Sequence, residues 1–223
     1  MDILYSLRQG LPNGREGQRN YHLLFCGSAL LARSLEFSPL FDAFQKHAEF
    51  LTALRAQSCL FVHAGVVGWQ GKAILIPGRS MTGKTTLVKA LVEAGATYYS
   101  DEFAVLDKTG RVHPYPAPLS IRGANSLLGV KTPIETLGGQ AGVEPLPVRL
   151  VVVTQFQSGA RWQPRVLTPA QALLSMMDNT VAAQREPQYT MPILRQAVMG
   201  AHSIQSKRGE SGRVARALLQ QLS

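Results

Sequence analysis

The 223-residue sequence is poor in cysteine, poor in acidic residues and free of long apolar runs. Its two cysteines, Cys26 and Cys59, lie in apolar segments without metal-ligand spacing, so we expect them to pack in a core within a reducing compartment. Apolar runs such as 150–153 have the length of a strand and are too short to cross a membrane. The N-terminus also lacks the basic and then apolar pattern of a secretion signal. We therefore expect a cytoplasmic protein with no membrane partner.

The scarcity of acidic residues leaves a marked positive charge. There are 14 Asp and Glu against 23 Lys and Arg, a net charge of +9. Such an excess fits phosphorylated ligands, an acidic partner or nucleic acid. The basic residues are scattered, with small groupings at Arg161/Arg165 and within 207–216, and no recognition helix or aromatic RNA-binding surface accompanies them. We therefore favour a basic surface that attracts phosphate over a nucleic-acid-binding protein.

The sequence does contain the pattern of a phosphate-binding loop. Residues 78–85, GRSMTGKT, fit G-x-x-x-x-G-K-[ST], and the loop lies between an apolar strand and an amphipathic helix that Gly95 ends. Glycines let the backbone turn its N–H groups around a polyanion, and the following helix directs its positive end toward it. The residues expected to hold the nucleotide are Gly78, Arg79, Ser80, Met81, Thr82, Gly83, Lys84, Thr85 and Thr86. A glycine-rich turn without a ligand is the plainer alternative.

Within such a loop two side chains have defined tasks. Lys84 is expected on the β- and γ-phosphate oxygens of ATP, and the Thr85 hydroxyl on Mg²⁺. The sequence therefore predicts ATP and Mg²⁺ as the bound cofactors.

The remaining patterns predict a single globular α/β domain, in keeping with 45% hydrophobic and 17% charged residues. We expect residues 1–58 to supply N-terminal strands and a helix packed on the same domain, and residues 59–223 to carry the main fold. Residues 1–20 are expected to be poorly ordered, and residues 129–147 to form a long loop. Strands are predicted at 21–26, 29–32, 59–67, 72–76, 97–99, 103–106, 112–115 and 148–156, and helices from Ser38, from Thr168-Pro169 to Met177, at 192–199 and at 212–222.

Asp101 and Glu102 end a predicted strand after the loop helix. Adjacent acids point in opposite directions from a strand, so one can serve the metal while the other faces a nucleophile. A solvated turn is the alternative interpretation.

Four segments resemble the catalytic domains of HPr kinase/phosphorylase, whose fold is shared with phosphoenolpyruvate carboxykinase. They occur in the family's order: Phe61-Val62-His63-Ala64-Gly65-Val66, the loop 78–85, Tyr99-Ser100-Asp101-Glu102 and Ile121-Arg122-Gly123. The resemblance implies a P-loop kinase domain with a mixed sheet and a hairpin, here 59–67 with 72–76, directly before the loop.

The resemblance also implies roles for single residues. Asp101 matches the acid that takes the proton from a serine hydroxyl, and Glu102 the neighbouring acid nearer the metal and phosphate, although the two roles can be exchanged. His63 matches the histidine that tunes the base, and Arg122 an arginine that contacts phosphate. A core histidine and a surface arginine are the plainer alternatives for these two positions.

The sequence departs from the family at several positions. Ser120 stands where family members usually carry a glutamate, and Met81 and Thr82 replace glycines of the phosphate loop. Residues 1–58 are too few for the separate N-terminal domain of full-length members, so we expect a divergent, stand-alone relative.

The leading hypothesis is transfer of the γ-phosphate of ATP to an acceptor serine on a protein or peptide other than HPr. A nucleotide-binding regulatory module, an ATPase and a small-molecule kinase are the alternatives, and the missing carboxylate at Ser120 favours the first two. The resemblance also allows for a homo-oligomer.

Overall fold

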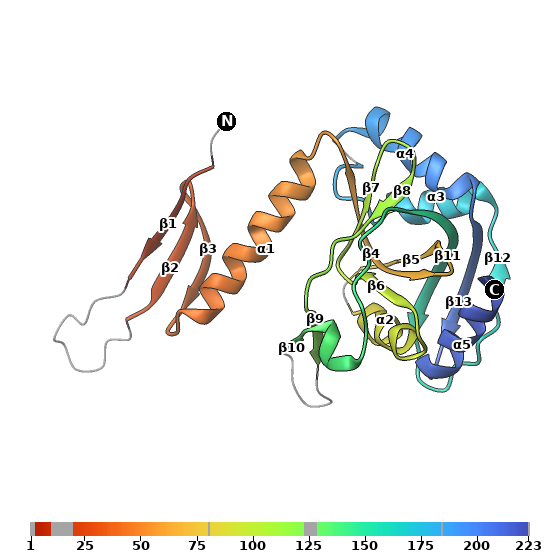
Figure 1. The fold of residues 1–223 in the computed structure, drawn as a ribbon. Helices are drawn as coiled ribbons and strands as arrows, with labels where there is room; N and C mark the ends of the chain where they lie inside the picture. The colour runs from red at the N-terminus through yellow and green to blue at the C-terminus, as the bar shows by residue number, and fades with distance from the viewer. Residues whose placement is uncertain (1–2, 10–19, 80, 123–128, 184, 223) are drawn as a thin grey trace. The chain divides into compact units, whose positions relative to one another are not determined.

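The computed structural model describes residues 3–9, 20–79, 81–122, 129–183 and 185–222 (Figure 1). The chain forms two compact units, Met1–Arg55 and Ala56–Ser223. The boundary lies close to the predicted division at 58/59. That the N-terminal elements pack on the same domain as the rest stays a prediction.

The smaller unit is an antiparallel sheet followed by a helix. Within its described residues the strand order is β1-β2-β3. The elements are β1 (Tyr5–Arg8), β2 (His22–Cys26), β3 (Ala29–Ser34) and α1 (Ser38–Arg55). The expectation that residues 1–20 lack order is wrong for Tyr5–Arg8. Strand β1 is held by pairing with β2 and by a 2.9 Å hydrogen bond between Tyr5 Oη and His47 Nδ1 on α1.

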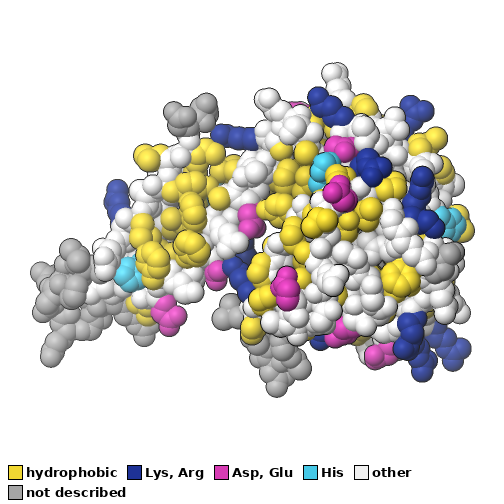
Figure 2. All heavy atoms as spheres, viewed as in Figure 1, with side chains coloured by type: hydrophobic (Ala, Val, Ile, Leu, Met, Phe, Trp, Pro, Cys, Tyr) yellow, Lys and Arg dark blue, Asp and Glu magenta, His cyan; other side chains and the backbone are white. Residues whose placement is uncertain are grey.

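Hydrophobic side chains also gather on the surface of this unit, as Figure 2 shows. The most exposed of them are Leu4, Leu30, Phe37 and Phe41.

A mixed sheet forms the centre of the larger unit. Over its described residues eight strands follow the order β12-β13-β11-β5-β4-β7-β8, with β6 paired to β4. Strand β11 runs parallel to β5 and β13, whereas β5–β4, β4–β6, β4–β7, β7–β8, β8–β11 and β12–β13 are antiparallel. The strands are β4 (Leu60–Trp69), β5 (Lys72–Pro77), β6 (Thr97–Ser100), β7 (Phe103–Leu106), β8 (Arg111–His113), β11 (Leu146–Phe156), β12 (Arg165–Val166) and β13 (His202–Arg208). The mixed α/β class and the hairpin before the loop are as predicted.

Helices cover both faces of this sheet (Figure 1). One face packs against α2 (Lys84–Glu93) and α5 (Ser211–Leu222), and the other against α3 (Pro169–Met177) and α4 (Pro187–Met199). The apolar stripe of α2 is buried, and each such side chain contributes about 1.5–3 kcal/mol. The predicted capping box of α3 is present, with Thr168 and Gln171 bonding each other's backbone N–H. Among the described helices, none combines the length and apolar character that a membrane crossing needs.

Several elements differ from the sequence prediction. The predicted loop 129–147 instead contains β10 (Gly129–Thr132), paired with β9 (Leu119–Arg122), and a 3₁₀ helix, η1 (Ile134–Leu137). The segment 129–147 is anchored by hydrogen bonds between the backbone of Tyr98 and the backbones of Gln140 and Gly142.

Two further differences lie near the C-terminus. Helix α4 begins at Pro187 rather than at the predicted residue 192, and it continues through Pro192. Strand β13 is absent from the sequence prediction because its sequence, HSIQSKR, lacks a continuous apolar pattern. Its parallel pairing with β11 decides its conformation.

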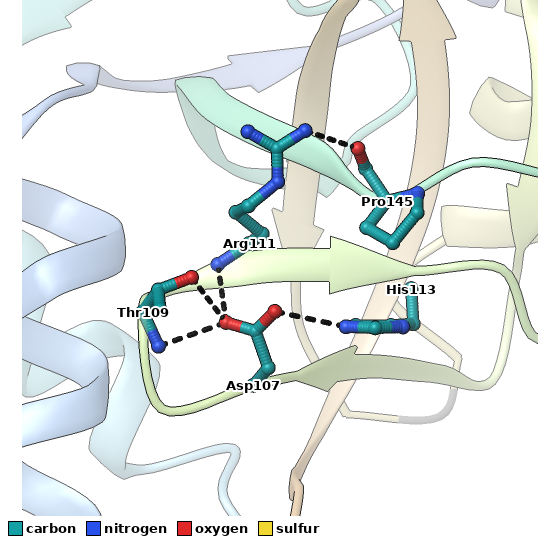
Figure 3. A network of polar contacts seen from close by, with 5 residues as sticks. All are labelled: Asp107, Thr109, Arg111, His113 and Pro145. Carbon is teal, nitrogen blue, oxygen red and sulfur yellow. Dashed lines mark hydrogen bonds and ion pairs between the residues drawn. The ribbon is translucent and has the colours of Figure 1, made fainter.

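The turn between β7 and β8 is organised by one carboxylate (Figure 3). Asp107 Oδ1 accepts hydrogen bonds from Thr109 N (2.8 Å), Thr109 Oγ1 (2.6 Å) and Arg111 N (3.1 Å), and Oδ2 lies 2.9 Å from His113 Nε2. Arg111 in turn donates to the carbonyl of Pro145. Burial raises the pKa of Asp107, but the hydrogen bonds outweigh this and hold its pKa below the ordinary value.

Replacing Asp107 with Ala should lower the free energy of unfolding by about 1–3 kcal/mol at neutral pH, because backbone and side-chain donors lose their acceptor. A carboxylate whose pKa is lowered on folding stabilises the protein above its unfolded pKa of about 4, and that contribution disappears as the pH falls. The difference from wild type should therefore shrink below about pH 4 in chemical denaturation measurements. Lys108→Ala, an exposed change in the same turn, is the control; an equal loss in both variants would contradict the assignment.

Candidate functional site

The loop between β5 and α2 is closed by contacts with its own backbone. The carbonyl of Arg79 accepts hydrogen bonds from Thr82 Oγ1 (2.9 Å) and from Lys84 Nζ (3.0 Å). Gly83 caps α2 in the left-handed region at φ 83°, and Met81 also has a positive φ of 72°. Met81 therefore occupies a conformation that favours glycine.

The other predicted loop residues are placed as follows. Gly78 follows β5 directly, and Thr85 and Thr86 lie in the first turn of α2. Ser80 lies outside the described residues.

Strand β4 joins this loop to the acidic pair. The carbonyl of His63 accepts a hydrogen bond from Gly78 N (3.1 Å), and Ala64 N donates to the carbonyl of Glu102 (3.2 Å). Neighbouring residues of one strand therefore hold the start of the loop and the turn between β6 and β7. The tertiary structure therefore brings the loop and the acidic pair together, although they are distant in the sequence.

The two acids lie in the turn between β6 and β7, and they differ in exposure. Asp101 is 3% exposed, whereas Glu102 is exposed to solvent. Asp101 Oδ1 accepts a 3.2 Å hydrogen bond from Tyr98 Oη, which also donates to the carbonyl of Ala117 (2.7 Å). Asp101 Oδ2 is buried and has no hydrogen-bond partner among the described residues.

Burial gives Asp101 unusual acid–base properties. Burial, and then the negative charge of Glu102, raise the pKa of Asp101 to about 6. The Thr85 and Tyr98 hydroxyls and the charge of Lys84 partly offset this increase. Thr85 is thus near enough to influence the carboxylate, although its hydroxyl does not complete a hydrogen bond to Oδ2. A carboxyl group with a pKa near neutrality is suited to exchanging protons.

His63 and Lys84 belong to the same electrostatic group. Burial, and then the positive charge of Lys84, lower the pKa of His63, while Glu102 acts in the opposite direction. Burial also lowers the pKa of Lys84, and the charges of Glu102 and Asp101 counteract it. The centre of the His63 ring lies 4.5 Å from that of the Phe103 ring, so the histidine packs in an aromatic setting beside the acids. The charges of Lys84 and Glu102 thus act on both His63 and Asp101.

The other candidate residues are less closely defined. Arg122 ends strand β9, but its side chain lies outside the described part of the structure. Ser120, on the same strand, packs its hydroxyl against Gly129 of β10. No group of three or more His, Cys, Asp or Glu side chains that could hold a metal occurs among the described residues. A Mg²⁺ ion at this site would therefore take Thr85 Oγ1, an Asp101 or Glu102 oxygen and non-protein ligands.

Arg208 supports the loop, and the sequence prediction does not include it. It is fully buried at the end of β13, where its Nη2 donates to the carbonyl of Gly83 (2.5 Å) and its Nη1 to Ser211 Oγ (2.8 Å). Its Nε is buried without a partner among the described residues, and burial lowers its pKa. Phe156 N also donates to the carbonyl of Thr82 (3.1 Å), so the ends of β11 and β13 together support the loop. The only sequence signal for Arg208 is its place in the basic grouping 207–216, a pattern that surface charge produces equally well.

The comparisons with known proteins give limited information. No protein-family model and no curated protein matches the chain. Among solved structures, the HPr(Ser) kinase/phosphatase from Coxiella burnetii is similar, with a TM-score of 0.40 and 14% identity, covering 73% of this chain and 99% of that chain. A likeness of this size concerns the fold at most.

The contact between Arg208 and the loop predicts a specific sensitivity at Gly83. A Cβ at this position would lie 2.6 Å from Arg208 Nη2 and 3.1 Å from Phe156 Cβ, in addition to the strain of a positive φ. Gly83→Ala should therefore lower the free energy of unfolding by about 2–4 kcal/mol.

Gly71→Ala is the matched control, because Gly71 has a similar φ of 73° but no other atom lies within 4 Å of the position that a Cβ would take there. We expect a loss of about 1 kcal/mol in this variant. Equal losses in the two variants, measured by denaturant titration, would show that Arg208 does not restrict the loop.

Proposed function

We propose that the chain is an ATP-dependent kinase that transfers the γ-phosphate to a serine-type hydroxyl of a protein or peptide, in the manner of HPr kinase. The observation that carries the proposal is a buried carboxylate, Asp101, beside Lys84 and Thr85 at the start of α2; it has a pKa of about 6, and one of its oxygens has no partner among the described residues. Strongly perturbed acids of this kind are typical of functional sites.

The residues at the loop fit a nucleoside triphosphate. The first N–H groups of a helix lack partners within the helix and its dipole is positive there; α2 has no side-chain cap among the described residues and no acidic residue in its first turn. Lys84 adds a positive charge for the β- and γ-phosphates, and Arg79, within the loop, is exposed. Thr85 Oγ1 and one acid would hold Mg²⁺, which when bound would neutralise charge on the phosphates.

In the proposed reaction Asp101 acts as the base. Its carboxylate accepts the proton of the acceptor hydroxyl as the hydroxyl oxygen bonds to the γ-phosphorus. The bond from that phosphorus to the β-phosphate oxygen breaks, and ADP leaves. Burial and the charge of Lys84 lower the pKa of His63, which in this proposal tunes the base, and Glu102 takes the metal side. The contact of Thr85 with Asp101 also supports the exchanged assignment, in which Asp101 serves the metal.

A second candidate is an ATPase or a nucleotide-sensing regulatory module. The observation that favours it is Ser120, which packs against Gly129 where family members usually carry a carboxylate. A small-molecule kinase is the third candidate. ATP turnover that requires an added protein or peptide would distinguish the proposed kinase from both of these candidates.

Asp101→Asn should bind ATP with Mg²⁺ as wild type does but transfer phosphate about 10²–10⁴-fold more slowly, because the proton acceptor is lost. Lys84→Ala should weaken both steps, raising the barrier by several kcal/mol. Transfer from radiolabelled ATP onto soluble proteins and serine peptides would be measured, with ATP affinity determined separately by calorimetry.

Lys89→Ala is the control, because Lys89 lies on the same helix but forms only a partly exposed ion pair with Glu93 (3.5 Å). If Asp101→Asn instead abolishes Mg²⁺-dependent ATP binding, the roles of Asp101 and Glu102 are exchanged. Slow phosphate release that no acceptor accelerates would reject the kinase in favour of an ATPase.

Asp101 should also reduce stability at neutral pH. Its pKa is raised on folding from 3.8 to about 6, so the folded protein binds the proton more tightly than the unfolded chain. Stability then falls as the pH rises from about 4 to about 6, and the loss persists above that range. Asp101→Asn should be more stable than wild type by about 1–3 kcal/mol at neutral pH, and equally stable near pH 4. Asp178→Asn makes the same change at an exposed carboxylate and is the control; an equal gain in this variant in thermal melts would contradict the assignment to Asp101.

A further inference from the structure

A cleft of about 820 Å³ lies where the parallel strands β5, β11 and β13 end. Gly78, Arg79 and Thr82 of the loop form one wall, while Gln155 of β11 and Lys207 of β13 contribute another. The carboxyl ends of parallel strands are the usual place for ligands in α/β proteins. Neither Asp101 nor Glu102 is among the described lining residues. The cleft is therefore a surface next to the loop that differs from the one at the acidic pair.

Positive charge dominates this cleft. Among its described lining residues, four are basic, Arg79, Arg161, Arg165 and Lys207, and one, Asp178, is acidic. All four basic residues are exposed, and none forms an ion pair with a carboxylate within the described part of the chain. Arg165 instead donates to Gln205 Oε1 at 2.6 Å. Cations without a paired carboxylate in a concave surface attract and concentrate a negatively charged partner there.

The cleft also offers unused hydrogen-bonding groups. Thr154 is 7% exposed and its Oγ1 has no partner, and Asn179 Oδ1 is likewise buried and unpartnered among the described residues. Both residues line the cleft, as do Gln155 and Gln163. Buried polar atoms are normally satisfied, so unpaired ones beside a cleft indicate a polar ligand. Amide and hydroxyl side chains of this kind suit the N–H and C=O groups of an extended peptide.

The composition of the lining argues against nucleic acid as the occupant. None of the described lining residues is aromatic, whereas single-stranded nucleic acids are held by base stacking on aromatic side chains as well as by charge. Phe156, the aromatic residue at the end of β11, does not line the cleft but lies beside the buried Arg208.

We infer that this cleft docks an acidic polypeptide segment and that this segment carries the acceptor hydroxyl to the loop. The inference rests on the proposed function for the transfer step, and it names the substrate class. Arg161, Arg165 and Lys207 recognise Asp or Glu residues near the acceptor, while Thr154 and Asn179 bond the peptide. Arg79 lies in both the cleft wall and the loop, so the docked segment reaches the phosphates.

The first test measures docking without nucleotide. Fluorescein-labelled peptides of equal length, with a central Ser flanked by Glu, by Gln or by Lys, would be titrated with the full chain in a fluorescence anisotropy assay. Wild type should bind the Glu peptide at least about 10-fold more tightly than the Gln peptide, and added salt should reduce this preference. Arg161→Glu and Lys207→Glu should each remove it.

Lys108→Glu is the matched control, because it makes the same charge change at an exposed turn between β7 and β8, away from the cleft lining. Circular dichroism melts confirm that each variant is folded. An equal loss in Lys108→Glu, or equal affinity of wild type for Glu and Gln peptides, overturns the inference. Tighter binding of a single-stranded oligonucleotide, lost in the same cleft variants, also overturns it and assigns the cleft to nucleic acid.

The experiments can reject the kinase proposal and the docking cleft independently of each other. Docking is measured without ATP, so a Glu peptide that still binds when the chain binds no ATP supports the cleft and rejects the kinase. Transfer from ATP that shows no preference for the Glu peptide over the Gln peptide supports the kinase and rejects the cleft as its acceptor site.

Discussion

The arrangement of the candidate site depends on the backbone of β4 at His63 and Ala64. The carbonyl of His63 receives the N–H of Gly78, and the N–H of Ala64 reaches the carbonyl of Glu102, so one strand fixes the loop and the acidic turn together. Backbone groups in a sheet cannot move without breaking several ladder bonds at once. The backbone of the loop and that of the acidic turn are therefore held in a fixed relation by main-chain hydrogen bonds.

The burial of Asp101 is costly for folding, and no bond to its second oxygen compensates for it within the described structure. A chain selected for stability alone would place an apolar or amide side chain there. Its retention beside Lys84 and Thr85 is understandable if the carboxyl group exchanges a proton or binds a metal. The same burial that destabilises the fold raises the pKa of Asp101 into the range in which acid–base chemistry is effective.

The loop is near groups of opposite charge. These are the acids at the turn between β6 and β7 and the basic residues at the ends of β11 and β13. Arg208 connects the end of β13 to the loop through its bond to the carbonyl of Gly83. In the proposed reaction a phosphate donor and an acidic acceptor would repel each other, and the cations of this arrangement would offset that repulsion.

The sequence by itself determined the hairpin, the loop with its helix and the capping box of α3, because these depend on local spacing and backbone chemistry. Only the tertiary structure decided that HSIQSKR is a strand, that residues 129–147 contain regular elements, and that Arg208 is buried against Gly83. Each of these depends on partners distant in sequence. An arginine that bonds a backbone carbonyl gives no pattern of its own, since any residue offers that acceptor.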